Sequence, residues 1–288
     1  APIIAAFLAV PILGEKIGYV YFILPFIFSI ENKYELIFAI LIGKGKYTIK
    51  IKDQKIQISK SRFTTLLHLL GCLTYAHSYS IDSSKILKIS FDQDNVFEIN
   101  LSELSFENTN LIELLYFGNK YGANFITEKH TNFDLRDKTF FISSKDNRRV
   151  ITTPEGINFF IDSMHPGNTI SETFVQRIHS INSKINWENK IIVDVGAECG
   201  DTALYFASMG AKVFSFEAIK KNYDMMLENL KINSSLSEKI TPINAAIGKN
   251  GILKFFVSNE TDEHGSIGAS FIYNNQSSNF KYENVTGF

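Results

Sequence analysis

The sequence predicts an α/β protein in which a Rossmann-like parallel sheet follows a smaller α+β region. Within residues 191–217 an apolar run ends at an acid, a glycine-bearing turn and a short amphipathic segment follow, and a second apolar run stops at Glu217. This order of strand, turn, helix, strand and acid is typical of units that hold an adenine nucleoside. Helical spacing at 222–230 and an apolar run at 240–247 extend the unit. We expect its C-terminal part to be incomplete at residue 288.

The composition indicates an intracellular chain of about two domains. Hydrophobic residues make up 45% of the 288 residues, enough for one or two sizeable cores. The 29 basic and 30 acidic residues nearly balance, so nothing favours a nucleic-acid partner. Cys72 and Cys199 lie far apart and match no metal or disulfide spacing. We therefore expect no metal site and a reduced, cytoplasmic setting.

Residues 1–45 are expected to form an apolar helical segment. Its apolar runs, at 1–13, 17–30 and 36–42, are each shorter than the roughly 20 residues that a spanning helix needs. A signal peptide is not evident, because the basic start and the small-residue cleavage site are missing. The first interpretation is buried or interfacial helices. Peripheral contact with a membrane surface through residues 1–43 is the second, and a spanning segment cut off at residue 1 is the third.

Residues 46–150 are expected to form a small α+β domain whose composition indicates no particular chemistry. Alternating apolar and polar residues at 47–52 and 55–59 predict a β-hairpin. The other expected elements are a helix at 63–73, a second hairpin from 86–91 and 96–101, a helix at 111–117, and short strands at 139–142 and 150–151.

Residues 151–288 are expected to form the cofactor-binding domain. A strand at 156–161 and a loop with the turn signal Pro166-Gly167 lead to an expected helix at 170–181, with Phe174, Ile178 and Ile181 facing inward. The run at 191–193 is continuous, which predicts a strand buried on both faces. A turn then follows the third strand, and a further strand is expected at 252–257.

Residues with cofactor-binding chemistry gather where these strands end. Asp194 lies at the carboxyl end of the first strand, where α/β sheets bind ligands. Gly196 and Gly200 remove side chains where a ligand would lie against the backbone. Glu217 can accept both hydroxyls of a ribose, and Asn244, with Ala245 after it, would approach the adenine.

The charge of the turn favours a cationic ligand. Its glycines are spaced Gly196-x-x-x-Gly200, unlike the G-x-G-x-x-G of dinucleotide enzymes. The carboxylates of Asp194 and Glu198 would repel a pyrophosphate but suit the sulfonium and amino groups of S-adenosylmethionine. We therefore prefer a methyl donor to NAD.

The stretch DVGAECGDTALYFASMGAKVFSFEA, the helix at 222–233 and INAAIG together resemble the FkbM-type S-adenosylmethionine-dependent methyltransferases, and an archaeal-like branch most closely. The resemblance covers about 151–288, including the lead-in around His165 and Glu172, and covers 1–150 weakly. Glu198 departs from the asparagine of many members, and Ala218-Ile219 replaces a common proline. The family continues with an acidic strand end near its acceptor site, so the resemblance predicts a chain truncated at its C-terminus.

The resemblance implies a site for S-adenosylmethionine. The residues implied are Asp194, Gly196, Ala197 and Gly200 at the methionine part, Glu217 at the ribose, Asn244 and Ala245 at the adenine, and Glu172 and Thr202 as further contacts.

The function predicted is O-methylation of a hydroxyl on a sugar, a lipid-linked glycan or a small metabolite. Two alternatives are a cofactor-binding module without turnover and a dinucleotide-dependent oxidoreductase. The candidate general bases are His165, His179, His264 and Glu263, and none is assigned as catalytic. The acceptor and the oligomeric state are left open.

Overall fold

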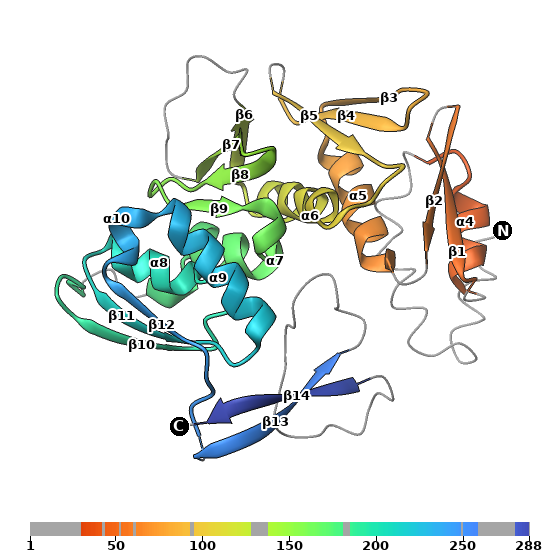
Figure 1. Ribbon diagram of the computed structural model, residues 1–288. Coiled ribbons are helices and arrows are strands. Elements are labelled where there is room, and N and C mark those ends of the chain that lie inside the picture. Colours follow the sequence, from red (N-terminus) through yellow and green to blue (C-terminus); the bar gives the residue numbers. More distant parts are fainter. Residues whose placement is uncertain are drawn as a thin grey trace. The chain divides into compact units, whose positions relative to one another are not determined.

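The computed structural model describes residues 30–41, 44–51, 53–59, 62–92, 95–127, 138–180, 185–248, 250–258 and 280–287. The chain is mixed α/β and divides into two compact units, residues 1–116 and 117–288 (Figure 1). The expected boundary at 150/151 falls inside strand β8 (Arg148–Thr152), which pairs with a neighbour on each side. That strand and its sheet therefore belong wholly to the second unit. No helix formed by the described residues is long and apolar enough to cross a membrane.

The first unit contains the two predicted hairpins and the predicted helix between them. Helix α4 (Lys33–Leu41) precedes the antiparallel pair β1 (Lys46–Ile51) and β2 (Gln54–Ser59), whose buried face is made of isoleucines and Tyr47. Helix α5 (Phe63–Tyr75) buries its leucine stripe. The second hairpin, β4 (Ile86–Ser90) and β5 (Val96–Asn100), gains an unpredicted partner, β3 (Ser78–Ile81). Of the expected apolar segment 1–45, residues 1–29 lie outside the described part.

Helix α6 (Phe106–Lys120) spans the division between the units and is longer than the predicted 111–117. A four-stranded sheet follows in the order β6-β7-β8-β9, built from β6 (Asn124–Thr127), β7 (Thr139–Lys145), β8 and β9 (Asn158–Phe160). Strand β6 was not predicted. Strand β9 is shorter than expected because the chain turns into the 3-10 helix η3 (Ile161–Ser163).

The single helix predicted at 170–181 is wrong. The chain instead forms one helical turn, α7 (Pro166–Asn168), a π-helical segment, η4 (Thr169–Val175), and a 3-10 turn, η5 (Ile178–Ser180). Arg177 has φ of 52°, a left-handed conformation that a continuous right-handed helix cannot contain. Phe174 is buried as predicted, but Ile178 is exposed. This break separates η4 from the chain that leads to the parallel sheet.

The predicted parallel unit is confirmed as a three-stranded sheet in the order β10-β11-β12. Its strands are β10 (Ile191–Val195), β11 (Lys212–Phe216) and β12 (Ile240–Ile243), and β12 ends earlier than the predicted residue 247. Helices α8 (Asp201–Ser208) and α9 (Lys220–Ile232) connect the strands, and the short α10 (Ser234–Ser237) precedes β12. The strand order advances in one direction, so right-handed crossovers place both connecting helices on the same face (Figure 1).

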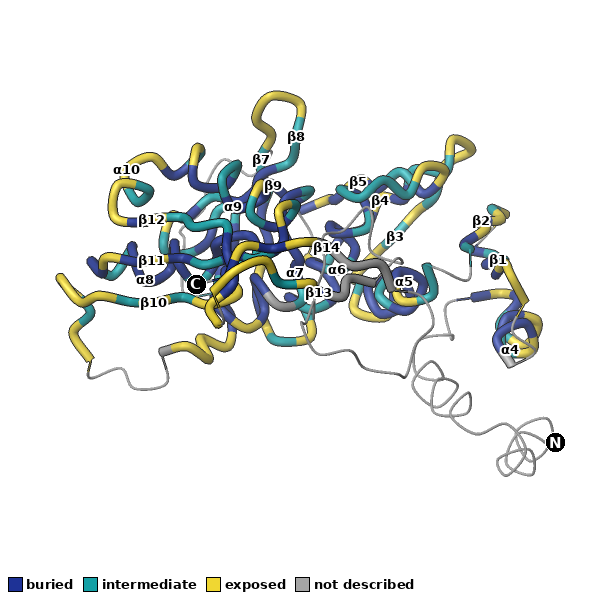
Figure 2. The backbone as a smooth tube through the Cα atoms, turned by 60° about the horizontal axis from the view of Figure 1, so that its bottom comes forward, coloured by how far each residue is buried: buried dark blue, intermediate teal, exposed yellow. Residues whose placement is uncertain are grey.

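Strand β10 is not buried on both faces, contrary to the prediction. Ile191, Val193 and Val195 are 68%, 58% and 61% exposed, whereas Ile192 and Asp194 between them are half-buried (Figure 2). The physical reason is the one-sided crossover pattern. Helices cover the face that carries Ile192 and Asp194, and within the described ranges no element covers the other face.

A hairpin borders the end of the parallel sheet. Strands β13 (Gly251–Ser258) and β14 (Phe280–Gly287) pair along their whole length, which confirms the strand predicted at 252–257. Phe255 and Val285 pack with Ile219 and Ala246, which follow β11 and β12 closely in the chain. The hairpin is therefore anchored beside the edge at which these two strands end.

Candidate functional site

The carboxyl ends of the parallel strands bring three of the predicted site residues to one edge of the sheet. Asp194 lies opposite Ser215 in the β10–β11 register, and the Ser215 hydroxyl donates to its Oδ2 at 3.5 Å. Glu217 directly follows β11. The Asn244 amide, directly after β12, donates to the carbonyl oxygens of Glu217 and Ala218 at 2.8 and 3.2 Å. The edge thus has the position at which open α/β sheets bind ligands.

The turn between β10 and α8 is fixed to the end of the neighbouring strand. The backbone N–H groups of Gly196 and Ala197 both donate to the Phe216 carbonyl, at 2.8 and 3.0 Å. Gly200 then closes the turn through a 2.7 Å bond to the Ala197 carbonyl. Three backbone hydrogen bonds therefore support the shape of the turn and its attachment to β11.

The two glycines of the turn have different structural reasons. Both have positive φ, 82° at Gly196 and 84° at Gly200. A Cβ at Gly196 would meet no atom within 4 Å, so open space lies against its backbone. A Cβ at Gly200 would lie 2.9 Å from Cγ of Met226 on α9. Only Gly196 thus has the environment expected of a ligand contact, whereas Gly200 allows α9 to pack against the turn.

Glu217 is buried, and its carboxylate already bonds the backbone. Oε2 accepts from the Glu198 N–H and Oε1 accepts from the Ile219 N–H, each at 2.8 Å. The Asn222 side chain also hydrogen-bonds this carboxylate. Two carboxylate oxygens can accept about four hydrogen bonds in all, so the ribose role remains a prediction. Burial raises the pKa of Glu217, and the two N–H donors oppose that shift.

Two further acids, the half-buried Asp194 and the buried Asp201, lie near this edge. Burial raises the pKa of Asp194 to about 6, and the negative charge of Glu217 adds to the shift. Burial, with the charge of Glu198, raises the pKa of Asp201 to about 7. The Thr173 hydroxyl donates to Asp201 Oδ2 at 2.5 Å. The sequence reasoning treated Asp201 only as the start of a helix, since an acid in a first helical turn is commonplace.

Two of the four candidate bases lie beside the turn. The buried His165 Nδ1 contacts Glu198 Oε1. The exposed His179 places Nε2 3.5 Å from the hydroxyl oxygen of Thr202, in the first turn of α8. His264 and Glu263 lie outside the described residues. The structure therefore gives His165 and His179 a geometric connection to the site.

Glu172 lies on η4, a segment that contacts the turn, but its own side chain is exposed. Its neighbours on η4 make the contacts to the turn. The hydroxyl of Thr169 lies 3.3 Å from Cys199 Sγ, and Thr173 bonds Asp201. The thiol of Cys199 is buried, which raises its pKa and keeps it protonated. The cofactor contact predicted for Glu172 remains a prediction.

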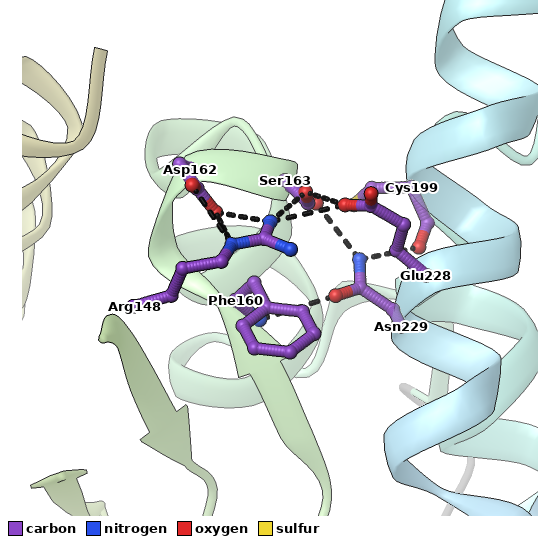
Figure 3. A network of polar contacts seen from close by, with 7 residues as sticks. All are labelled: Arg148, Phe160, Asp162, Ser163, Cys199, Glu228 and Asn229. Atoms are coloured by element: carbon purple, nitrogen blue, oxygen red, sulfur yellow. Dashed lines mark hydrogen bonds and ion pairs between the residues drawn. The ribbon is translucent and has the colours of Figure 1, made fainter. Parts of the chain in front are cut away.

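Asn229 on α9 ties the turn to strand β9, and Asn233, directly after α9, adds a second tie between that helix and β9. The sequence reasoning missed this connection. Asn229 accepts from the Phe160 N–H at 3.1 Å and donates to the carbonyls of Ser163 and Cys199 at 2.8 and 3.1 Å (Figure 3). Asn233 accepts from the Asn158 N–H at 2.9 Å and donates to its carbonyl at 2.7 Å. Since β9 is the edge strand of its sheet, these side-chain amides bond backbone groups of β9 that a neighbouring strand would otherwise bond.

Arg148 forms the outer part of this network (Figure 3). Its guanidinium makes a two-point contact with Asp162, bonds Glu228 Oε2 at 3.0 Å, and lies 3.8 Å from the centre of the Phe160 ring. The Ser163 hydroxyl also donates to Glu228, at 2.6 Å. Burial alone would lower the pKa of Arg148 and raise that of Glu228, but their hydrogen bonds reverse both directions. The network fixes η3 between β8 and α9.

Comparisons with protein-family models, with curated proteins and with solved structures found no match to the chain. Among the residues that the structure describes, no group of three or more histidine, cysteine or acidic side chains is placed to hold a metal ion. The site therefore rests on its own geometry, and the family resemblance remains a prediction.

Proposed function

We propose that the chain is an S-adenosylmethionine-dependent methyltransferase that acts on a hydroxyl of a sugar, a lipid-linked glycan or a small metabolite. The observation that carries the proposal is the open space at Gly196, on a sheet edge that carries the carboxylates of Asp194 and Glu217. A pyrophosphate there would be repelled by the carboxylates of Asp194 and Glu217 when these are ionised. A sulfonium and an ammonium group would be attracted.

The residues present fit this cofactor. Asp194 and the backbone at Gly196 and Ala197 would face its methionine part, Glu217 would use its remaining lone pairs for the ribose, and Asn244-Ala245 would border the adenine. When bound, S-adenosylmethionine supplies a methyl group activated by the sulfonium. The part of the protein is to align that group with the acceptor and to exclude competing water.

A hydroxyl acceptor is helped by a base, and His165 is the favoured candidate. A carboxylate can only accept, so the contact with Glu198 assigns the proton of the neutral ring to Nδ1 and leaves the lone pair on Nε2. His179, beside Thr202, is the second candidate. In either case the protein accepts the proton that the acceptor oxygen loses.

Calorimetric titration with S-adenosylhomocysteine, S-adenosylmethionine and NADH tests the proposal. We expect the two adenosyl ligands to bind and NADH not to bind. Asp194→Asn should weaken binding of S-adenosylmethionine, whereas Asp224→Asn, an exposed change on α9, should not. Binding of NADH alone would support an oxidoreductase, and binding of none of the three would refute the site.

Turnover separates an enzyme from a cofactor-binding module. A donor labelled on its methyl group is incubated with the protein and with hydroxylated sugars, lipid-linked glycans or small alcohols. We expect label transfer to one of these classes, and a smaller rate constant for His165→Gln with unchanged affinity for S-adenosylhomocysteine. Tight adenosyl binding with no transfer to any hydroxyl would instead favour the module.

A further inference from the structure

Helix α4 in the first unit exposes two aromatic side chains, beside Glu35, on the face opposite its buried residues. Leu36, Ala39 and Ile40 are buried, whereas Tyr34 and Phe38 are 65% and 60% exposed. Residues four apart lie on the same face of a helix, so the two exposed rings form one outward patch. A globular surface helix ordinarily has a polar outer face. The aromatic pair therefore indicates that the outward side of this helix also contacts an apolar partner.

The chain around this patch is basic. Residues 30–60 contain seven lysines and three acids, a net charge of +4, although the whole chain has a net charge of −1. Lys33 begins the helix, and the exposed Lys44 and Lys46 follow it. In the β1–β2 register Lys50 lies opposite Lys55 on the polar face of the hairpin. Lys44 and Lys46 thus place positive charge at the C-terminal end of the aromatic patch, whereas at the N-terminal end Lys33 lies between the exposed acids Glu31 and Glu35.

The position of the helix on the hairpin is fixed by its first residues. The Asn32 amide donates to the Thr48 carbonyl at 2.9 Å and its Oδ1 accepts from the Lys50 N–H at 2.7 Å. The Glu31 N–H donates to the Lys50 carbonyl at 3.1 Å. These contacts occupy the edge of β1 and hold α4 with Tyr34 and Phe38 outward.

We propose that Tyr34 and Phe38, with the lysines around them, form a surface that binds an anionic lipid bilayer peripherally. Aromatic side chains favour the interface between headgroups and acyl chains, and lysines near it are attracted to anionic lipids. The helix has nine residues, or about 14 Å at 1.5 Å per residue, too short for a hydrocarbon layer of roughly 30 Å. It can therefore lie along the surface without crossing it. The excess of lysines favours this partner over an apolar protein, which would explain the rings but not the charge.

The test is sedimentation of the full chain with vesicles of phosphatidylcholine alone and of phosphatidylcholine with added phosphatidylserine. We expect binding to the anionic vesicles that weakens as salt is raised. The double change Tyr34→Ser with Phe38→Ser should lower the partition coefficient on the order of tenfold or more. Changing Lys44 and Lys46 to glutamine should lower it about fivefold for each lysine.

Matched controls separate this surface from general stickiness. Ile252→Ser removes an exposed apolar side chain of the second unit, and Lys145→Gln with Lys212→Gln removes two exposed lysines there. Both controls should bind vesicles as the parent does. Equal binding to the two vesicle types, or unchanged binding after the Tyr34 and Phe38 changes, would overturn the proposal. A change of oligomeric state by the aromatic variant, with vesicle binding unchanged, would also overturn it and assign the patch to a second copy of the chain.

Discussion

Replacing Asn229 by alanine is expected to lower the free energy of unfolding of the second unit by about 3 kcal/mol. The change removes the bonds from the Phe160 N–H and to the carbonyls of Ser163 and Cys199. Each such bond contributes about 1 kcal/mol, and more is lost when a buried partner stays unsatisfied. The better helix propensity of alanine offsets only about 0.5 kcal/mol of this loss.

Urea unfolding followed by tryptophan fluorescence measures this effect. Trp187 is the only tryptophan, and its ring lies 4.8 Å from that of Phe206 on α8, so the signal reports the second unit. Asn250→Ala, at an exposed position, is the control and should change stability by less than about 0.5 kcal/mol. A loss below about 1 kcal/mol for Asn229→Ala would refute the reasoning, because the three bonds would then contribute almost nothing.

The isosteric change Asn229→Asp tests which end of the amide matters. A carboxylate keeps the bond from the Phe160 N–H but cannot donate to Ser163 or Cys199. We expect a loss of stability at neutral pH that shrinks on acidification, because a protonated carboxyl regains one donor. An aspartate variant as stable as the parent at neutral pH would show that the two donated bonds are dispensable.

Three other predictions concern the site and its support. Burial raises the pKa of Asp201 to about 7, so between about pH 4 and 7 the folded state retains a proton that the unfolded chain has released, and the free energy of unfolding should fall as pH rises through this range. Asp201→Asn should flatten this slope in urea titrations. An unchanged slope would contradict the prediction. Gly196→Ala should lower stability in thermal melts by about 1 kcal/mol, because of backbone strain, and should abolish adenosyl binding in calorimetry. Gly200→Ala should lower stability more, because it also displaces Met226. Equal losses of stability would count against the different roles assigned to the two glycines. Arg148→Met should lower the free energy of unfolding by about 1–2 kcal/mol at neutral pH. Burial raises the pKa of Glu228, but the bonds from Ser163 and Arg148 lower it overall, so the stability that Glu228 contributes is present above its usual pKa and is lost as pH falls through its lowered pKa. The effect of Arg148→Met should therefore shrink in acid. Arg148→Lys should recover only part of that stability, and full recovery would show that the two-point contact is unimportant.

The elements that the sequence predicted well are those set by local periodicity. In the two hairpins, in α5 and in the β10–α8–β11–α9 run, alternation or helical spacing of apolar residues marks each element within its own segment of the chain. Strands β3 and β6, of four residues each, were not predicted. The prediction of a helix at 170–181 was wrong because Arg177 adopts a left-handed backbone conformation, which the pattern of apolar residues does not reveal.

The candidate site divides in the same way. Asp194, Gly196 and Glu217 were predicted as site residues because a strand end, a turn and an acid follow one another in sequence. The contacts that hold the turn join residues far apart. Asn229 bonds Cys199 across 30 residues, and Arg148 bonds Glu228 across 80. No single-chain pattern marks such pairs, and an asparagine within an amphipathic helix reads as an ordinary polar position.

The uncovered face of the parallel sheet has a practical consequence for handling the protein. Ile191, Val193, Val195 and Phe214 are exposed side by side on β10 and β11, and β10 also has a free edge in the described part of the sheet. Such a face and edge together favour self-association in solution. Binding of a hydrophobic dye should therefore be strong in the native state, and sedimentation should depend on protein concentration. Changing Val193 to threonine, which keeps the β-branched shape, is expected to reduce both effects without loss of the fold.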